Sequence, residues 1–216
     1  MKFYKIDGEL IPAMAEYCDL MNEDFSGSDL SGANFKNRSF YNTDFTGCNL
    51  DGADFKDAVL WRCRLDETSL IGANFNFVNA RKCSFIGAEA ANVDFSSGTF
   101  EESKFTNSNL QSADFSNSDL SECHFNDTDI RLANFSATCL LGAYFYEANF
   151  EKNDFQYSSF LSLTAFIRYE MNQKEIYSQL TSKGCNFYEA NAENSNWVKE
   201  KGEINFIPLF SKKKWF

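Results

Sequence analysis

Apolar side chains return at every fifth position from Leu20 to Phe160, without an insertion or a slip of phase. Most of these central residues are Phe or Leu, and only Ala80 and Ala90 are small. A period of five fits neither an α-helix, which repeats every 3.6 residues, nor a flat β-strand, which repeats every two. It requires a chain that returns to the same wall after a fixed number of five-residue units, which predicts an all-β solenoid.

Each unit also has a fixed order of side chains around its central residue. A small residue stands two positions before it, Asp or Asn is common one position before it, and Gly often follows two positions after it. The clearest instances are Ala33-Asn34-Phe35, Ala53-Asp54-Phe55, Ala73-Asn74-Phe75, Ala113-Asp114-Phe115 and Ala133-Asn134-Phe135. This order resembles the A-(D/N)-(L/F)-x-x motif of the pentapeptide-repeat family, over about two-thirds of the chain. The resemblance implies a right-handed quadrilateral β-helix with four pentads in each coil, here of about seven coils.

Central residues twenty positions apart share their chemistry, as a coil of four pentads requires. Those from Phe35 to Phe155 are all Phe, and each follows Asn or Asp, whereas those from Leu30 to Phe150 are mostly aliphatic. We expect residues twenty apart to stack at one strand spacing, ~4.8 Å. The large central residue and its small neighbour then fill the interior, where each buried Phe contributes roughly 1.5–3 kcal/mol.

The pattern divides the chain into four segments. We expect an N-terminal cap over 1–17, the repeat β-helix over 18–162, a helical segment over 163–184, and a residual coil with a C-terminal cap or tail over 185–216. Apolar residues recur at helical spacing in the third segment. Two interpretations remain open for 185–199, a further coil or a second helix packed on the first.

Composition limits the compartment and the chemistry. No apolar run approaches the length of a membrane span, and the first residues lack the basic and apolar regions of a signal peptide. Five of the seven cysteines occupy the small position of their unit, which favours small core residues in a reducing cytoplasm. A zinc site is not expected, because there is no Cys-x-x-Cys and only one histidine.

Charge and the scarcity of catalytic groups argue against an enzyme. The net charge of −11 comes from the repeat region, which disfavours direct binding to nucleic acid. His124 stands at an outward position, where a surface histidine is expected rather than a catalytic base. A β-helix filled with side chains also leaves no cavity for a substrate. We therefore expect no enzymatic activity, no cofactor and no metal.

Acidic side chains form the first candidate surface. Two interpretations are open: these residues serve solubility and the turn preference of Asp and Asn, or they form a site for a protein partner. The candidate partner-binding residues are Asp54, Asp94, Glu101, Glu102, Asp114, Asp119, Glu122, Asp127, Asp129 and Asp154.

An apolar stripe forms the second candidate surface. It consists of the residues that follow one set of central residues, namely Met21, Tyr41, Trp61, Leu141 and Leu161. Exposed aromatic residues in a row indicate an interface. The same residues would also suit a surface covered by the N-terminal segment or by the C-terminal helix.

The resemblance also suggests a function. Within the family, the quinolone-resistance and mycobacterial fluoroquinolone-resistance proteins are acidic rods that engage DNA gyrase, which implies a DNA mimic acting on gyrase or another topoisomerase. Unlike the quinolone-resistance members, this chain has no looped-out interruption in its repeats, and its C-terminal region is longer. An adaptor or effector is the alternative, with the rod as a spacer and 163–216 making the contact. A homodimer through the C-terminal region is a further expectation.

Overall fold

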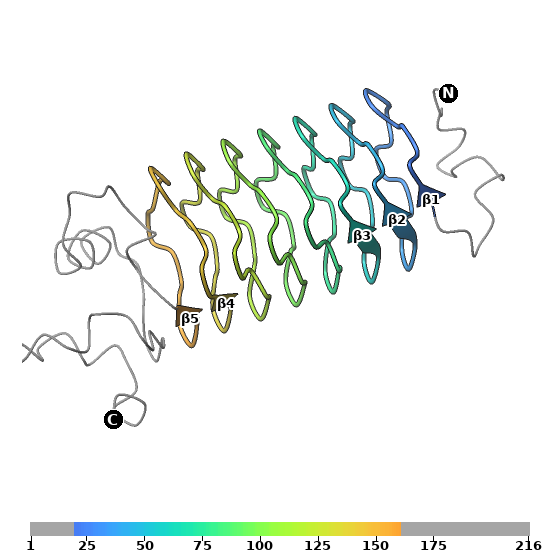
Figure 1. The fold of residues 1–216 in the computed structure, drawn as a ribbon. Coiled ribbons are helices and arrows are strands. Elements are labelled where there is room, and N and C mark those ends of the chain that lie inside the picture. Colours follow the sequence, from blue (N-terminus) through green and yellow to red (C-terminus); the bar gives the residue numbers. More distant parts are fainter. Residues whose placement is uncertain (1–19, 161–216) are drawn as a thin grey trace, which may run out of the picture.

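A computed structural model describes residues 20–160, which wind into a rod of stacked coils (Figure 1). Named strands occur towards both ends of it. β1 (Leu20–Met21), β2 (Ser39–Tyr41) and β3 (Val59–Trp61) form one parallel sheet, and β4 (Cys139–Leu140) pairs with β5 (Ser159–Phe160) in a second. The strands are short because each side of a coil holds a single pentad before the chain turns.

Residues twenty positions apart pair along the whole described rod. The pairing begins with Leu20 and Phe40 in β1 and β2, and single parallel bridges continue it from Asp24–Asp44 to Asn134–Asp154. Four pentads therefore complete one coil, as the sequence predicts. Adjacent coils lie one strand spacing apart, ~4.8 Å.

Each coil has four sides, which we name by their central residues. Side A carries Leu20 and every twentieth residue after it, side B starts at Phe25, side C at Leu30 and side D at Phe35. The cap over 1–17, the helical segment over 163–184 and the residues after it lie outside the described part of the chain. The total number of coils therefore stays a prediction.

The central residues fill the interior. From Phe25 to Phe155 each is at most 2% exposed. On side D the rings form a stacked column, with Phe95 and Phe115 centroids 4.8 Å apart at 8°, and Phe115 and Phe135 5.3 Å apart at 3°. Rings of side B meet this column edge-on, as Phe105 does with Phe115 at 83°. The predicted columns of apolar residues are confirmed.

Polar residues at the small positions link successive coils. The Cys123 thiol donates a hydrogen bond to the carbonyl oxygen of Phe100 at 2.9 Å, and the Ser108 hydroxyl donates to that of Phe85 at 2.8 Å. The Phe100 carbonyl also accepts from the backbone N–H of Ser103, so the thiol uses its second lone pair. A small polar residue at these positions thus satisfies its own buried donor and strengthens the stack.

The chain turns two residues after each central residue. Every such corner from Asn22 to Tyr157 has a positive φ, between +53° and +71°. Gly adopts this conformation without strain, which explains its frequency there, although most corners hold other residues. Gly98 is different, because it stands at a small position and a Cβ there would lie 2.4 Å from the ring of Phe100. It makes room for that ring.

Candidate functional site

The acidic residues of side D owe their position to a repeated turn. Asp94 and Asp114 each accept, through Oδ1, the backbone N–H two residues ahead, at 2.9 Å in both cases. Asp54 and Asp154 make the same bond, at 3.0 Å. One carboxylate oxygen therefore shapes the turn. The register places these residues in one column, with Asn34, Asn74 and Asn134 between or beside them.

A second group of candidate acids lies on side A and at its corner. Glu101 pairs with Arg81 at 3.4 Å, and Glu102 pairs with Lys82 at 3.0 Å. Asp119 accepts bonds from the backbone and the hydroxyl of Ser121. Glu122 follows Glu102 by one coil, at an exposed corner.

The last two candidates lie on other parts of the coil. Asp127 is at the corner between sides B and C, with a φ of +56°. Asp129 is on side C, where Arg131 bonds both of its oxygens, the shortest distance being 2.6 Å. The guanidinium hydrogen bond lowers the pKa of Asp129.

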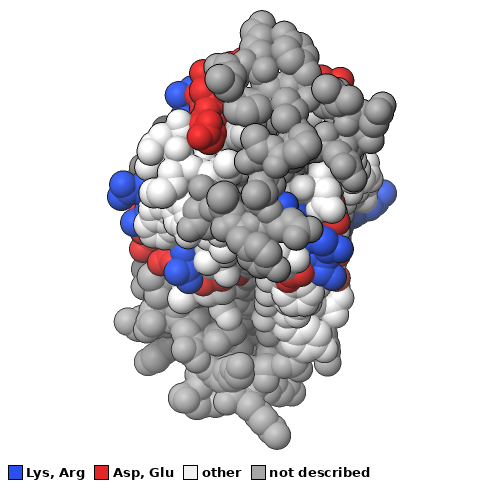
Figure 2. Space-filling model, turned by 90° about the vertical axis from the view of Figure 1, so that its right-hand side faces the viewer, with Lys and Arg blue, Asp and Glu red and all other residues white. Residues whose placement is uncertain are grey.

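The predicted acidic site is therefore not one patch. Its members occupy several sides of the rod, and Asp54, Glu101, Glu102 and Asp129 have a basic partner within 4 Å. Seen from the N-terminal end, Lys and Arg are mixed with Asp and Glu around the visible rim (Figure 2). The side D column and the group on side A are the two places where the register does bring candidates together.

The predicted apolar stripe lies on side A. Met21 pairs with Tyr41 in β1 and β2, and Tyr41 pairs with Trp61 in β2 and β3. Met21 is 58% exposed and Leu141 is 41% exposed, whereas Tyr41 and Trp61 are half-buried. Arg81, Glu101 and Ser121 separate Trp61 from Leu141 in this column, and Leu161 lies outside the described residues.

Among residues 20–160, the side chains best suited to chemistry are isolated or enclosed. The His124 ring stacks on Tyr144, with centroids 4.8 Å apart, and partial burial followed by the charge of Lys104 lowers the pKa of His124. Burial raises the pKa of the Cys48 thiol to about 11 and that of Cys123 further. Within residues 20–160 no three His, Cys, Asp or Glu side chains form a group that could hold a metal ion. The same residues contain no helix with the length and apolarity that a bilayer crossing needs.

Comparison with the models of known protein families identifies the family of the repeat. Residues 58–135 match the model of a pentapeptide repeat region, and residues 18–57 and 128–160 match the model of pentapeptide repeats in eight copies. This chain belongs to the pentapeptide-repeat family. Proteins of the family form right-handed quadrilateral β-helices, and the four-sided parallel stacking of residues 20–160 agrees with that architecture.

Solved pentapeptide-repeat structures resemble this chain in part. A trypsin-treated variant of QnrB1, a plasmid-mediated fluoroquinolone resistance protein, is 23% identical with a TM-score of 0.49, over 76% of this chain and 85% of QnrB1. A pentapeptide-repeat protein of the Arabidopsis thaliana thylakoid lumen is 34% identical with a TM-score of 0.32, over 45% of this chain and 65% of its own. HetL is a pentapeptide-repeat protein of the cyanobacterium Nostoc sp. strain PCC 7120 that is involved in heterocyst differentiation regulation. It is 20% identical with a TM-score of 0.35, over 82% of this chain and 81% of HetL. No curated protein sequence matches.

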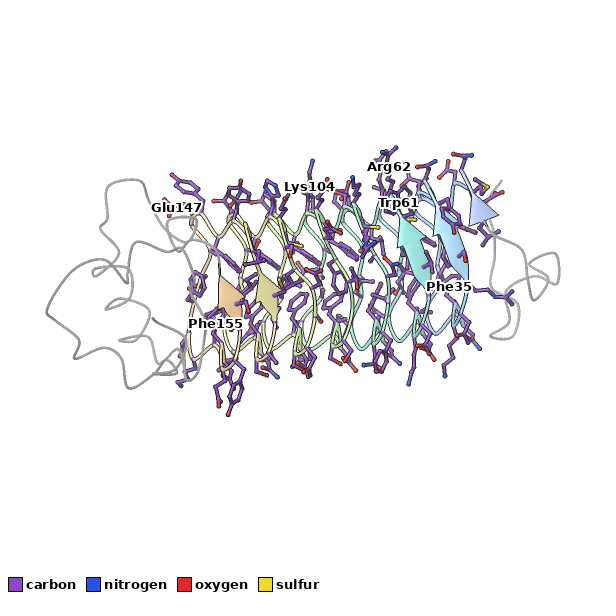
Figure 3. All side chains as sticks on the ribbon, turned by 60° about the horizontal axis from the view of Figure 1, so that its bottom comes forward. Phe35, Trp61, Arg62, Lys104, Glu147 and Phe155 are labelled. Atoms are coloured by element: carbon purple, nitrogen blue, oxygen red, sulfur yellow. The ribbon has the colours of Figure 1, made fainter. Side chains whose placement is uncertain are left out.

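Sequence reasoning missed several exposed apolar residues of this pentapeptide-repeat rod. Phe77 and Tyr157 are 54% and 58% exposed at corners, and Ile71 is 59% exposed beside one. The repeat itself carries the signal, because the two positions after each central residue face outward, as Arg62 does at the edge of the rod in Figure 3. An apolar residue at these two positions therefore lies at the surface, exposed like Phe77 or half-buried like Trp61.

Proposed function

We propose that this protein is a non-enzymatic acidic scaffold that binds a protein partner along its rod, with DNA gyrase or another topoisomerase as the candidate and duplex DNA as the structure it imitates. The observation that carries the proposal is the side D column. Its aspartates are held by backbone bonds through Oδ1, at 2.9–3.0 Å, so their charges are already placed before a partner arrives. Pre-organised charge favours binding, because less freedom is lost on association.

The linear charge density supports the imitation of DNA. Seven coils at ~4.8 Å give a rod of about 34 Å, close to one turn of the duplex. A net charge of −11 over that length is about one negative charge per 3 Å, roughly half the density of duplex DNA at ~1.7 Å. A basic surface built for DNA would attract such a rod, and salt would weaken the attraction. The free thiols of the described residues fit a reducing compartment, and we propose the cytoplasm.

The test removes charge without changing the turn. The chain itself uses Asn34, Asn74 and Asn134 for the same Oδ1 bond, so Asn is a matched replacement for Asp here. The variant combines Asp54→Asn, Asp94→Asn, Asp114→Asn and Asp154→Asn in the full chain. We expect it to bind purified gyrase about tenfold more weakly at low salt, and to inhibit supercoiling less, while its Tm is unchanged.

The control removes the same charge from sides B and C. It combines Asp24→Asn, Asp29→Asn, Asp44→Asn and Glu89→Gln, and it should keep the wild-type affinity for gyrase. If both variants weaken binding equally, the side D column is not the binding surface. If the wild-type chain neither binds nor inhibits gyrase at low salt, gyrase is not the partner.

A further inference from the structure

The edge between sides A and B changes its chemistry in order along the rod. We call it the charged edge and define it by the two outward positions after each side A central residue. From the N-terminal end it holds Met21 and Asn22, Tyr41 and Asn42, Trp61 and Arg62, Arg81 and Lys82, Glu101 and Glu102, Ser121 and Glu122, and Leu141 and Gly142. Apolar residues are therefore followed by basic, then acidic, then again apolar residues.

The register fixes the spacing along the charged edge. Backbone N–H groups of Arg62, Lys82 and Glu102 donate to the carbonyls of Arg81, Glu101 and Ser121, at 3.1, 2.9 and 2.9 Å. Each step is therefore one coil, ~4.8 Å. Lys82 and Arg62 lie 5.6 and 5.9 Å from the ring of Trp61, which holds the basic group beside the aromatic residue.

The order of residues is self-complementary under a two-fold rotation. Consider an axis perpendicular to the rod, passing between the coils of Arg81 and Glu101. It places Arg81 opposite Glu101 of a second copy, Lys82 opposite Glu102, and Arg62 opposite Glu122. It also places Tyr41 opposite Leu141, and Trp61 opposite the small Ser121. Because the coil spacing is uniform, all these pairs come into register together, and each pair occurs twice.

Existing ion pairs strengthen rather than oppose this arrangement. Arg81 already contacts Glu101 and Lys82 contacts Glu102 within one chain. Two copies would place these pairs head to tail, so that each charge gains a second neighbour of opposite sign. Side D has the opposite property, because an antiparallel copy about an axis between Asp94 and Asp114 sets these two aspartates against each other, and Asp54 against Asp154. The charged edge thus favours a second copy where side D repels one.

We propose that two copies of this protein associate side by side and antiparallel through the charged edge. The interface is isologous, with charged pairs at its centre and the apolar residues of the predicted stripe towards its ends. This contact differs from a dimer through the C-terminal region, and it leaves side D free for a partner.

Arg62 and Glu122 provide the test, since neither takes part in the ion pairs among residues 20–160. Sedimentation velocity of the full chain should show a concentration-dependent dimer at ~0.05 M salt that weakens at ~0.5 M. Arg62→Glu and Glu122→Arg should each weaken it at least about tenfold, because each sets like charges opposite one another twice. Lys152→Glu, at the opposite corner of the coil, makes the same charge change as Arg62→Glu and should have no effect.

Mixing the two variants gives the decisive measurement. A chain with Arg62→Glu and a chain with Glu122→Arg would meet with opposite charges at both contacts, so the mixture should form a heterodimer although neither variant dimerises alone. The double variant Arg62→Glu/Glu122→Arg should dimerise like the wild type. A wild-type chain that stays monomeric at low salt, a dimer that ignores both reversals, or a mixture that stays monomeric would each overturn the proposal.

Discussion

The side D phenylalanine column makes the strongest quantitative prediction, and Phe115 is its best probe. Its side chain has no exposed surface, and its ring stacks on Phe95 and Phe135 in the two adjacent coils. The side B ring of Phe105 also meets it edge-on at 5.6 Å. Replacing Phe115 by Ala therefore removes contacts to the coil before and to the coil after.

The size of the effect follows from these contacts. Burial of a Phe side chain is worth roughly 1.5–3 kcal/mol, and each stacked pair adds about 0.5–1.5 kcal/mol. Together they give about 2.5–6 kcal/mol, which brackets the ~3–5 kcal/mol measured for Phe→Ala in other cores. We expect Phe115→Ala to lower the free energy of unfolding by about 3–5 kcal/mol.

Urea unfolding of the full chain, followed by circular dichroism, measures this change. Phe115→Leu is the matched control, because Leu65 already replaces Phe between Phe45 and Phe85 on side B. We expect the Leu variant to lose only about 1–2 kcal/mol. A loss below about 1 kcal/mol for Phe115→Ala would refute the reasoning, since it would mean that the column contributes little to the stack.

Three further predictions concern a thiol, a link between coils and the corners. The free energy of unfolding should fall as the pH rises from about 9 to about 11, because the unfolded chain loses the Cys48 proton in this range while burial keeps the thiol of the folded chain protonated. Urea titrations across this range measure the fall, and Cys48→Ala should lessen it. Asp66 Oδ1 accepts a hydrogen bond from the backbone N–H of Ile86 at 2.9 Å. Asp66→Ala should therefore lower the free energy of unfolding by about 1–2 kcal/mol, whereas Asp66→Asn, which keeps the acceptor oxygen, should retain most of the wild-type stability. Equal losses for the two variants would show that the acceptor is unimportant. Ala137 has a φ of +55°, a conformation that Gly adopts with less strain. Ala137→Gly should therefore raise the free energy of unfolding by about 0.5–1 kcal/mol, seen as a higher Tm. Gly52→Ala, at a φ of +65°, should lower the Tm.

The fold was predictable because the repeat period determines which residues stack on one another. Phe95 and Phe115 stack because the chain returns after twenty residues, and this period is visible in the sequence without any contact being known. The small residues two positions before each central residue were equally predictable from the sequence, although their hydrogen bonds were not. That Cys123 donates to a carbonyl twenty-three residues earlier depends on the offset between coils, which the residue pattern does not state.

The candidate site was less predictable because outward side chains carry no single signal. Asp114 shapes a turn and carries a charge at the same time, so the sequence left both explanations of the acidic residues open. The structure shows the turn bond, and the binding of a partner stays a proposal. Glu101 and Asp129 were grouped with it by their charge and by their position near the later coils, yet each has its own basic partner. Whether two surface charges pair depends on how each side chain turns towards the next coil or along its own, and the residue pattern does not contain that information.

The twenty-residue register limits how this protein can change in length. An insertion of one pentad would leave the buried ladder intact but rotate everything after it by a quarter turn, so that the Asp94 and Asp114 column would no longer be continuous. An insertion of four pentads would lengthen the rod and keep every surface in phase. Variants that keep every surface of the rod continuous should therefore differ in steps of whole coils, while a single added residue would displace every later phenylalanine from the interior.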